Sequence, residues 1–183
     1  MELGQHTIEP LLVLCKKGNR LAQLEVYNRY QKAMYNVAYR IVKDTAEAED
    51  VMQESFIAAF SKLDSFKGDA TFGAWLKRIV VNNSISIYKK SQRYVAIDET
   101  LLEESPEEIS GVDLSECSDL RTSAVLSRMD ELQESYRQIL TLHYIEGFDY
   151  EEICEILQIS YGNCRTMISR AKESLRKKLA IAS

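Results

Sequence analysis

Glycine and proline are scarce in this chain, with seven glycines and two prolines among 183 residues. Neither residue occurs between Gly18 and Gly68, and apolar residues recur there at spacings of three and four. Gly and Pro are the residues that most often interrupt helices, and this spacing puts apolar side chains on one helical face. The β-branched run 79–81 keeps the helical period on both sides. The sequence therefore predicts an all-α fold.

Long apolar segments are also missing. No run of 18 uncharged apolar residues occurs, and the first ten residues lack a basic stretch followed by an apolar one. We therefore expect no membrane insertion and no secretory signal peptide. The four cysteines lie apart without CxxC spacing, which favours reduced packing thiols of a cytoplasmic protein over zinc ligands or disulfides. These cysteines are Cys15, Cys117, Cys154 and Cys164.

The residues that most enzymes need are missing as well. The two histidines, His6 and His143, have no nucleophile or metal-ligand cluster at a meaningful spacing. No glycine-rich loop that could hold a phosphate occurs either. The sequence thus predicts no catalytic site, no metal and no cofactor. A phosphoacceptor role for His143 is the alternative within this class.

The net charge of −5 is unevenly distributed along the chain. Residues 1–90 carry 13 basic and 10 acidic side chains, a net charge of +3. Residues 91–120 carry one basic and nine acidic side chains, whereas residues 161–183 carry six basic and one acidic. An acidic, polar segment with few aromatics does not bury enough apolar surface to order itself. We expect a flexible acidic linker between two small helical domains, the second of which ends in a basic helix.

Helical periodicity divides the first domain into several helices. One or two helices are expected from Leu21 to Ile41, another from about Ala46 to Leu63, and a third from Phe72 to about Lys90. The polar segment 64–71 is expected to be a loop. In the second domain a helix is expected from Ser135 to Ile145.

Residues 146–172 have the pattern of a short amphipathic helix, a tight turn and a longer basic helix. In the first helix Ile153, Ile156 and Leu157 share one face. Ser160 ends the turn, and we expect it to accept a backbone N–H of the second helix as its N-cap. This layout is typical of a helix-turn-helix that reads duplex DNA.

The second of these helices separates apolar from polar residues. Its outward side carries Arg165, Thr166, Ser169 and Arg170, which are residue types that bind base edges and phosphates. Gly162, a poor helix former, would allow close approach to a partner. The inward stripe consists of Cys164, Ile168, Ala171, Leu175 and Leu179.

Four segments occur in a fixed order along the chain, residues 49–56, 66–82, 147–153 and 164–171. Together they resemble one family, the extracytoplasmic-function (ECF) sigma factors, bacterial initiation factors that have only regions 2 and 4 of the sigma-70 family. The resemblance covers about Leu21 to Leu179. Residues 49–56 are similar to the region 2 polymerase-binding helix, and residues 66–82 to the −10 recognition segment. Residues 147–153 and 164–171 are similar to the region 4 reader of the −35 element. The implied function is to bind core RNA polymerase and direct promoter-specific initiation, without catalysis.

The resemblance implies a division of the chain into three parts. Residues 1–92 correspond to region 2, which binds core polymerase and recognises and melts the −10 element. Residues 93–120 form the acidic flexible linker, and residues 121–183 form region 4, the helix-turn-helix that recognises the −35 element. The implied partners are promoter DNA, the clamp helices of the polymerase β′ subunit, the flap of the β subunit and an anti-sigma factor.

The resemblance also assigns roles to particular residues. Core-polymerase binding is expected from one exposed polar face of a helix, since Asp50, Gln53 and Glu54 stand at i, i+3 and i+4. The −10 contacts are expected from Lys67, Arg78, Asn82, Asn83, Ser86, Lys89 and Lys90. The −35 contacts are expected from Tyr150, Asn163, Arg165, Thr166, Ser169 and Arg170.

Two positions depart from the family pattern. Ser86 stands where the family commonly has Asp or Asn, which changes the hydrogen bonding expected there. Met167 stands where many members have Arg, which removes a phosphate contact. Both changes are expected to alter promoter preference.

One alternative from a different class fits the same motifs. In a stand-alone helix-turn-helix regulator, residues 1–90 would be a sensing or dimerising domain and the chain would bind duplex DNA without polymerase. A tight complex with an operator and no effect on core polymerase would favour this regulator.

Overall fold

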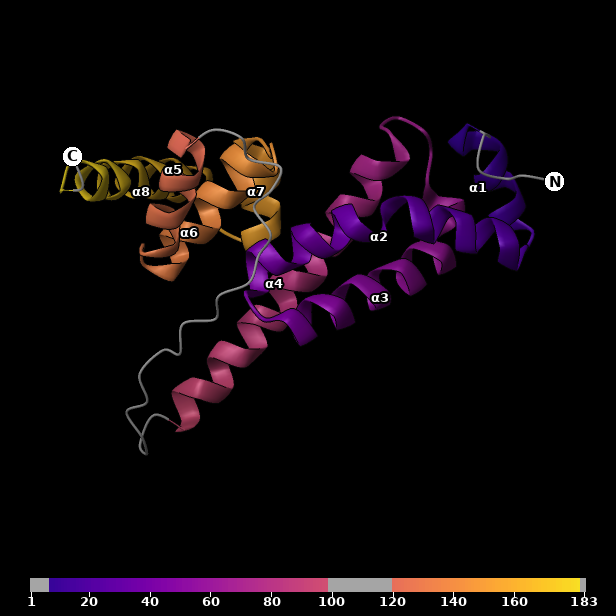
Figure 1. The fold of residues 1–183 in the computed structure, drawn as a ribbon, viewed down its shortest axis with the longest axis horizontal. Helices are drawn as coiled ribbons and strands as arrows, with labels where there is room; N and C mark the ends of the chain where they lie inside the picture. The colour runs from indigo at the N-terminus through magenta and orange to yellow at the C-terminus, as the bar shows by residue number, and fades with distance from the viewer. Residues whose placement is uncertain (1–6, 99–119, 182–183) are drawn as a thin grey trace. The chain divides into compact units, whose positions relative to one another are not determined.

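The computed structural model describes residues 7–98 and 120–181, and every regular element in them is helical (Figure 1). The all-α prediction is confirmed. The chain divides into two compact units, Met1–Tyr94 and Val95–Ser183. Within the described ranges no helix is long and apolar enough to cross a membrane. The helices of the first unit are α1 (Ile8–Lys16), α2 (Arg20–Val42), α3 (Thr45–Ser61), the 3₁₀ turn η2 (Leu63–Ser65) and α4 (Phe72–Asp98).

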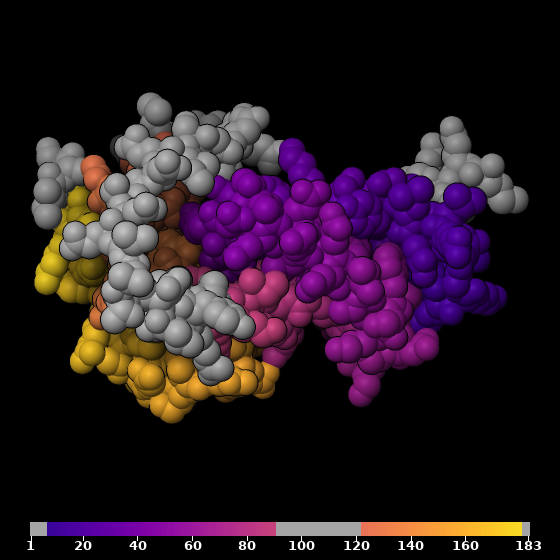
Figure 2. All heavy atoms as spheres, turned by 90° about the horizontal axis from the view of Figure 1, so that it is seen from below, coloured from indigo at the N-terminus to yellow at the C-terminus, as the bar shows by residue number. Residues whose placement is uncertain are grey.

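A helical hairpin, α2 and α3, forms the centre of the first unit (Figure 1). α2 ends at Lys43, whose backbone is left-handed at φ 60°. α3 begins directly afterwards, because the Asp44 carboxylate accepts the backbone N–H of Glu47 at 2.8 Å. This N-cap satisfies one of the orphan donors of the first turn. In the space-filling view the spheres of α1, α2 and α3 form one continuous surface (Figure 2).

The buried face of the hairpin matches the apolar periodicity of the sequence. Fully buried side chains meet between α2, α3 and α4, and they leave the opposite faces of α3 and α4 to solvent. Removing this apolar surface from water stabilises the unit. The buried residues from these three helices include Val26, Ile41, Val51, Phe56, Leu76, Val80 and Val81.

An aromatic cluster joins the loop before α4 to the hairpin. Phe66 lies 5.4 Å from Trp75 and 5.8 Å from Phe72, between ring centroids, and Tyr30 of α2 lies 5.4 Å from Phe72. Gly73 permits this packing, since a Cβ there would stand 3.1 Å from the Tyr30 ring. The cluster therefore fixes where α4 starts. It also gives Trp75 a packing role, since this ring contacts both Phe66 and Phe72.

Two features of the first unit differ from the sequence prediction. α1 was not expected, yet Leu11 and Cys15 bury its inner face, and Pro10 falls in its first turn, where a missing N–H costs little. α4 continues to Asp98 instead of ending near Lys90. No glycine or proline interrupts that stretch, so the first six residues of the predicted linker, 93–98, are helical. Most of the linker, residues 99–119, lies outside the described residues, as does His6.

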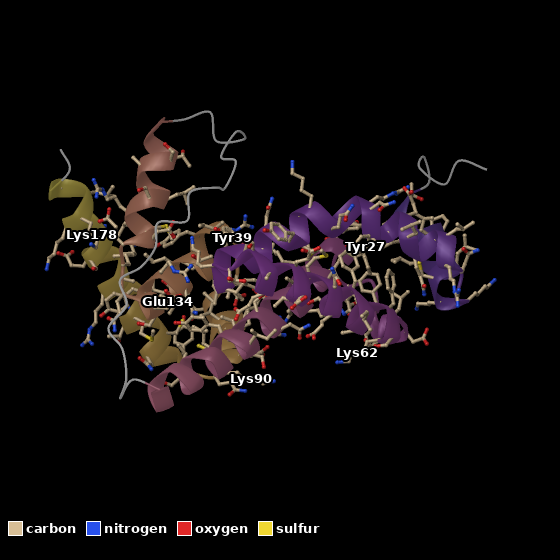
Figure 3. The ribbon with its side chains drawn as sticks, turned by 60° about the horizontal axis from the view of Figure 1, so that its bottom comes forward. Tyr27, Tyr39, Lys62, Lys90, Glu134 and Lys178 are labelled. Carbon is tan, nitrogen blue, oxygen red and sulfur yellow. The ribbon has the colours of Figure 1, made fainter. Side chains whose placement is uncertain are left out.

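The second unit is a smaller helical bundle. It contains α5 (Leu120–Asp130), α6 (Glu134–Leu140), a π-helical turn η3 (Thr141–Ile145), α7 (Tyr150–Leu157) and α8 (Tyr161–Ile181). α6, α7 and α5 each contact α8. Figure 3 labels Glu134 at the start of α6 and Lys178 on α8, and the Lys178 ammonium pairs with Glu131 at 3.3 Å. The most deeply buried core residues are Ile139, Leu140, Leu142, Ile153, Cys164, Ile168 and Ala171.

Candidate functional site

The predicted polar face of α3 is exposed as the spacing requires. Asp50, Gln53 and Glu54 are all exposed, and their backs are Val51 and Phe56, which are buried. The Gln53 amide donates to Glu49 at 3.4 Å, a weak contact that leaves the face open. The helix thus presents two carboxylates and an amide to solvent, which suits an electrostatic contact with another helix.

Sequence reasoning missed one residue on this face. Ile57 stands one turn beyond Gln53 and Glu54 and two turns beyond Asp50, and its side chain is 70% exposed. A large exposed aliphatic side chain beside polar groups is typical of an interface anchor. The signal was available in the sequence, because Ile57 continues the i, i+3, i+4, i+7 pattern of this face.

α4 carries the predicted −10 residues mostly as one stripe. Asn82, Ser86, Lys89 and Lys90 are exposed, and Arg78 is half-buried one turn before Asn82. The spacings of four, four, three and one keep these side chains on one side of the helix. Lys90 is labelled on α4 in Figure 3. An amide, a hydroxyl and three cations along one stripe can bind a nucleic-acid strand through its bases and phosphates.

Asn83 does not share this stripe. Its side-chain amide donates to the Ser55 hydroxyl of α3 at 2.9 Å. Ser55 is fully buried and donates in turn to the Val51 carbonyl at 2.6 Å. The amide of Asn83 therefore satisfies a buried hydroxyl between two helices, a role that the sequence did not indicate.

Lys67 comes from the loop that precedes α4. It is exposed, and its neighbour Phe66 packs on Trp75. Gly68 follows with a left-handed backbone at φ +84°, which favours glycine. Thr71 then caps α4 by accepting the Ala74 N–H at 3.2 Å. The loop thus holds Lys67 near the beginning of the same helix that carries the polar stripe.

The helix-turn-helix is built by local turn chemistry. Asp149 and Glu152 form a capping box at the start of α7, with backbone-to-carboxylate distances of 2.8 and 3.0 Å. Gln158 ends α7 in a left-handed conformation at φ 59°. The Ser160 hydroxyl accepts the Asn163 N–H at 3.3 Å, which confirms the predicted N-cap of α8.

The predicted outward residues of α8 are exposed. Asn163, Arg165, Ser169 and Arg170 present their side chains to solvent, opposite the buried Cys164, Ile168 and Ala171. Thr166 is also exposed, and its hydroxyl donates to the Gly162 carbonyl at 2.8 Å. A helix of this kind presents two guanidinium groups and small polar side chains along one side. These groups match the donor and acceptor pattern of a DNA major groove.

Tyr150 belongs to a row of rings beside the helix-turn-helix. Its centroid lies 5.0 Å from that of His143 and 5.9 Å from that of Tyr161. The ring nitrogen Nδ1 of His143 is 2.9 Å from the Phe148 carbonyl, which accepts its hydrogen. Tyr150 is half-buried in this row, whereas Tyr161 is exposed. The sequence did not single out Tyr161.

The cysteine pair of the second unit is a packing feature. Cys164 of α8 is fully buried, and the Cys154 thiol of α7 lies near enough to hydrogen-bond with it. Burial raises the pKa of the Cys164 thiol to about 11, with a smaller contribution from Cys154. A thiol with such a pKa is a poor nucleophile at neutral pH. Among the described residues there is no cluster of three metal-ligating side chains.

Two family models match the chain. The model of sigma-70 region 2 matches residues 26–94, and the model of sigma-70 region 4 matches residues 122–175. The first range contains the polar face of α3 and the stripe of α4. The second contains α7, the turn and α8 as far as residue 175.

Curated relatives match over nearly the full length. The chain is 35% identical over 173 residues to the ECF RNA polymerase sigma factor SigW of Bacillus subtilis, covering 90% of this chain and 92% of that protein. It is 31% identical to the RNA polymerase sigma-H factor of Pseudomonas aeruginosa, covering 97% and 96%. It is 32% identical to the ECF RNA polymerase sigma-E factor of Escherichia coli K12, covering 96% and 95%.

Solved structures share the fold. A sigma factor from Bartonella quintana, crystallised with the anti-sigma factor NepR, superposes with a TM-score of 0.58 at 24% identity, covering 87% of this chain and 97% of that one. CnrH, solved with the cytosolic domain of CnrY, superposes with a TM-score of 0.54 at 24% identity, covering 95% and 97%.

Proposed function

This chain belongs to the extracytoplasmic-function sigma factors of the sigma-70 family, and we propose which of its surfaces bind polymerase and promoter. As a sigma factor it is a non-catalytic subunit that binds core RNA polymerase and directs promoter-specific initiation. The stand-alone regulator, which lacks region 2, does not account for the match over residues 26–94. We propose that residues 1–92 act as region 2, residues 93–120 as the linker, whose first six residues continue α4, and residues 121–183 as region 4.

The exposed face of α3 is the proposed polymerase contact. Asp50, Gln53 and Glu54 supply charge and hydrogen bonds, and Ile57 supplies an apolar anchor at the same face. Exposed acids next to one aliphatic side chain suit a partner helix with basic and apolar residues. In this family that partner is the clamp helix pair of the β′ subunit, and the β flap is the expected contact of region 4.

The stripe on α4 is the proposed −10 contact. Asn82 reads a base edge with its amide, while Arg78, Lys89 and Lys90 neutralise phosphates. Lys67 and Ser86 complete the set from the loop and from the middle of the stripe. Since the Asn83 amide is engaged with Ser55, we assign Asn83 a positioning role between α3 and α4 in place of a direct contact.

The outward side of α8 is the proposed −35 contact. Arg165 and Arg170 are exposed and bind guanine edges or phosphates, and Asn163, Thr166 and Ser169 bind beside them. Tyr150 braces this side through its ring contacts. The observation that carries the assignment is that every predicted α8 residue is exposed, while Cys164, Ile168 and Ala171 behind them are buried.

Two further parts of the proposal follow from the family. An anti-sigma factor that grips both domains is the proposed inhibitor, and the chain is proposed to act in the cytoplasm, where core polymerase is. Co-purification of an inhibitor from the native host with the tagged chain tests the first part.

Transcription from the upstream region of the chain's own gene tests the proposal. The purified chain added to core polymerase is expected to start transcription at one site, and Asp50→Lys or Glu54→Lys is expected to weaken core association by about tenfold or more. Asp64→Lys is the matched control, because the Asp64 side chain is 92% exposed outside α3 and the charge change is the same. Equal core affinity of the Asp50→Lys, Glu54→Lys and Asp64→Lys variants would remove α3 from the polymerase contact.

A further inference from the structure

Tyr161 is the first residue of the recognition helix α8, and its side chain is 54% exposed. Ser160 caps the helix directly before it. In helix-turn-helix proteins the N-terminal residues of the recognition helix contact base edges in the major groove. A large exposed ring therefore stands where the edge of a base pair would lie.

The ring of Tyr161 is held in place from behind. It contacts the Tyr150 ring at 5.9 Å, Tyr150 contacts the His143 ring at 5.0 Å, and His143 is anchored to the Phe148 carbonyl at 2.9 Å. An exposed aromatic side chain loses rotamer freedom when it binds a partner. Because this row already restricts the ring, less freedom remains to be lost on binding.

Gly162 supports close approach at the same place. Its backbone is not left-handed, and a Cβ built on it would meet nothing within 4 Å. Neither the helix nor the core of the unit therefore requires glycine there, although glycine destabilises a helix. A partner surface that comes close to α8 at this point would explain why a glycine stands next to Tyr161.

The charges near Tyr161 favour a base over a phosphate as its partner. Asp149 and Glu151 line a shallow hollow together with His143, Tyr150 and Tyr161. Both carboxylates are exposed and repel the phosphate backbone. The Tyr161 ring lies beside these carboxylates, so we expect it to contact an apolar group on a base and not a phosphate.

We propose that Tyr161 reads the −35 element by laying its ring against the C5-methyl group of a thymine. Thymine alone among the four bases presents a methyl group in the major groove, and apolar side chains recognise it by contact. The proposal rests on the proposed function, and it adds one position of sequence preference that the arginines do not supply.

Replacing thymine by uracil removes only this methyl group and leaves the protein unchanged. In holoenzyme binding to promoter DNA with single thymine-to-uracil replacements along the −35 element, one position is expected to lose about fourfold in affinity, the effect of one apolar methyl group. Tyr161→Ala holoenzyme is expected to bind the thymine and uracil promoters equally. Tyr161→Phe is expected to keep the difference, because the ring and not the hydroxyl makes the contact.

Three results would overturn the proposal. The first is a native holoenzyme that does not distinguish uracil from thymine at any −35 position. The second is a Tyr161→Phe variant that loses the difference, since a hydroxyl contact would then be responsible. The third is a Lys177→Ala control, changed on the exposed far part of α8, that loses the difference as fully as Tyr161→Ala. A chain that starts transcription but fails these tests refutes only the Tyr161 contact, whereas a chain that starts none refutes the proposed function.

Discussion

The two units place their polar faces by different means. In the first unit α3 and α4 are long helices, and each carries an exposed stripe on the side opposite a buried one. In the second unit α7 has only eight residues, and the position of α8 depends on a capping box, a left-handed Gln158 and an N-cap. Helical period therefore decides which side chains share a face in both units, whereas the placement of α8 after the eight-residue α7 depends on turn chemistry.

This difference has a consequence for stability. A stripe on the back of a large helical core tolerates changes at its exposed positions, because the core lies on the other face. A recognition helix held by short elements depends on a few buried contacts, such as those of Ile168 with the core of its unit. We therefore expect substitutions on the exposed stripes of the first unit to cost little stability, whereas a change at a buried residue of the recognition helix should cost much more.

The largest expected effect separates the stabilities of the two units. Ile168→Ala removes a side chain that is 2% exposed and should cost about 2–5 kcal/mol of unfolding free energy. The single tryptophan, Trp75, lies in the first unit and reports on that unit alone. In denaturant unfolding, the variant should therefore begin to lose its circular dichroism at a lower denaturant concentration than the native chain. The midpoint of its Trp75 fluorescence transition should stay the same.

Leu76→Ala is the mirror variant in the first unit, since Leu76 is fully buried in α4. It should lower the denaturant midpoint of the Trp75 fluorescence transition by a similar amount. The part of the circular dichroism change that comes from the second unit should keep its native midpoint. If Ile168→Ala moves the fluorescence transition as far as Leu76→Ala does, the units unfold as one and the two-domain division is wrong.

The sequence predicted the fold class and most helix faces, because those depend on period and on breakers. The α3 face and the outward side of α8 followed from spacing alone. α1 was missed, since a nine-residue helix next to a terminus gives a weak periodic signal. The end of α4 was predicted wrongly, because the acidic composition of residues 91–120 indicated a linker. No glycine or proline stands before Asp98 to end the helix.

The sequence did not predict which side chains contact each other between different helices. Asn82 and Asn83 are neighbours in the sequence, and both were predicted to contact the −10 element. In the structure, however, the Asn83 amide bonds to Ser55, which is 28 residues away in the chain. The ring row of His143, Tyr150 and Tyr161 also joins residues whose contacts depend on the π-helical turn. Such contacts follow from packing and not from local pattern.

An intermediate effect is expected on the recognition side of α8. Arg165→Ala or Arg170→Ala should reduce discrimination between the −35 promoter and a mutated one by about 1–3 kcal/mol, because each removes donors for a base edge. Competition binding of holoenzyme to the two promoters measures this. Core affinity and the thermal unfolding of the chain should stay unchanged.

Lys177→Ala is the control for these variants, since Lys177 is exposed on the same helix and pairs only weakly with Glu173 at 4.0 Å. It should weaken binding to both promoters alike or not at all. Equal loss of discrimination in Lys177→Ala and Arg165→Ala would mean that the recognition side of α8 has been placed wrongly.

The smallest expected effect distinguishes two neighbouring asparagines. Asn83→Ala should lower the unfolding free energy of the first unit by about 0.5–1.5 kcal/mol, because the buried Ser55 hydroxyl loses a partner. Asn82→Ala should change it by less than about 0.5 kcal/mol, since that side chain is exposed, yet should impair opening of the −10 element. Trp75 fluorescence measures the first quantity, and permanganate reactivity of unpaired thymines measures the second.

A double-mutant cycle with Ser55→Ala decides whether the hydrogen bond carries the effect of Asn83. If it does, Asn83→Ala should cost less in the Ser55→Ala background than in the native chain, because the bond is already absent there. Holoenzyme that contains Asn83→Ala should open the promoter as well as native holoenzyme when it is assayed well below the unfolding transition. A positioning residue does not touch the DNA, so its loss matters only where the first unit is partly unfolded. The opposite result is an Asn83→Ala variant with the native unfolding free energy that opens the promoter as poorly as Asn82→Ala. It would show that Asn83 contacts DNA together with the stripe of α4.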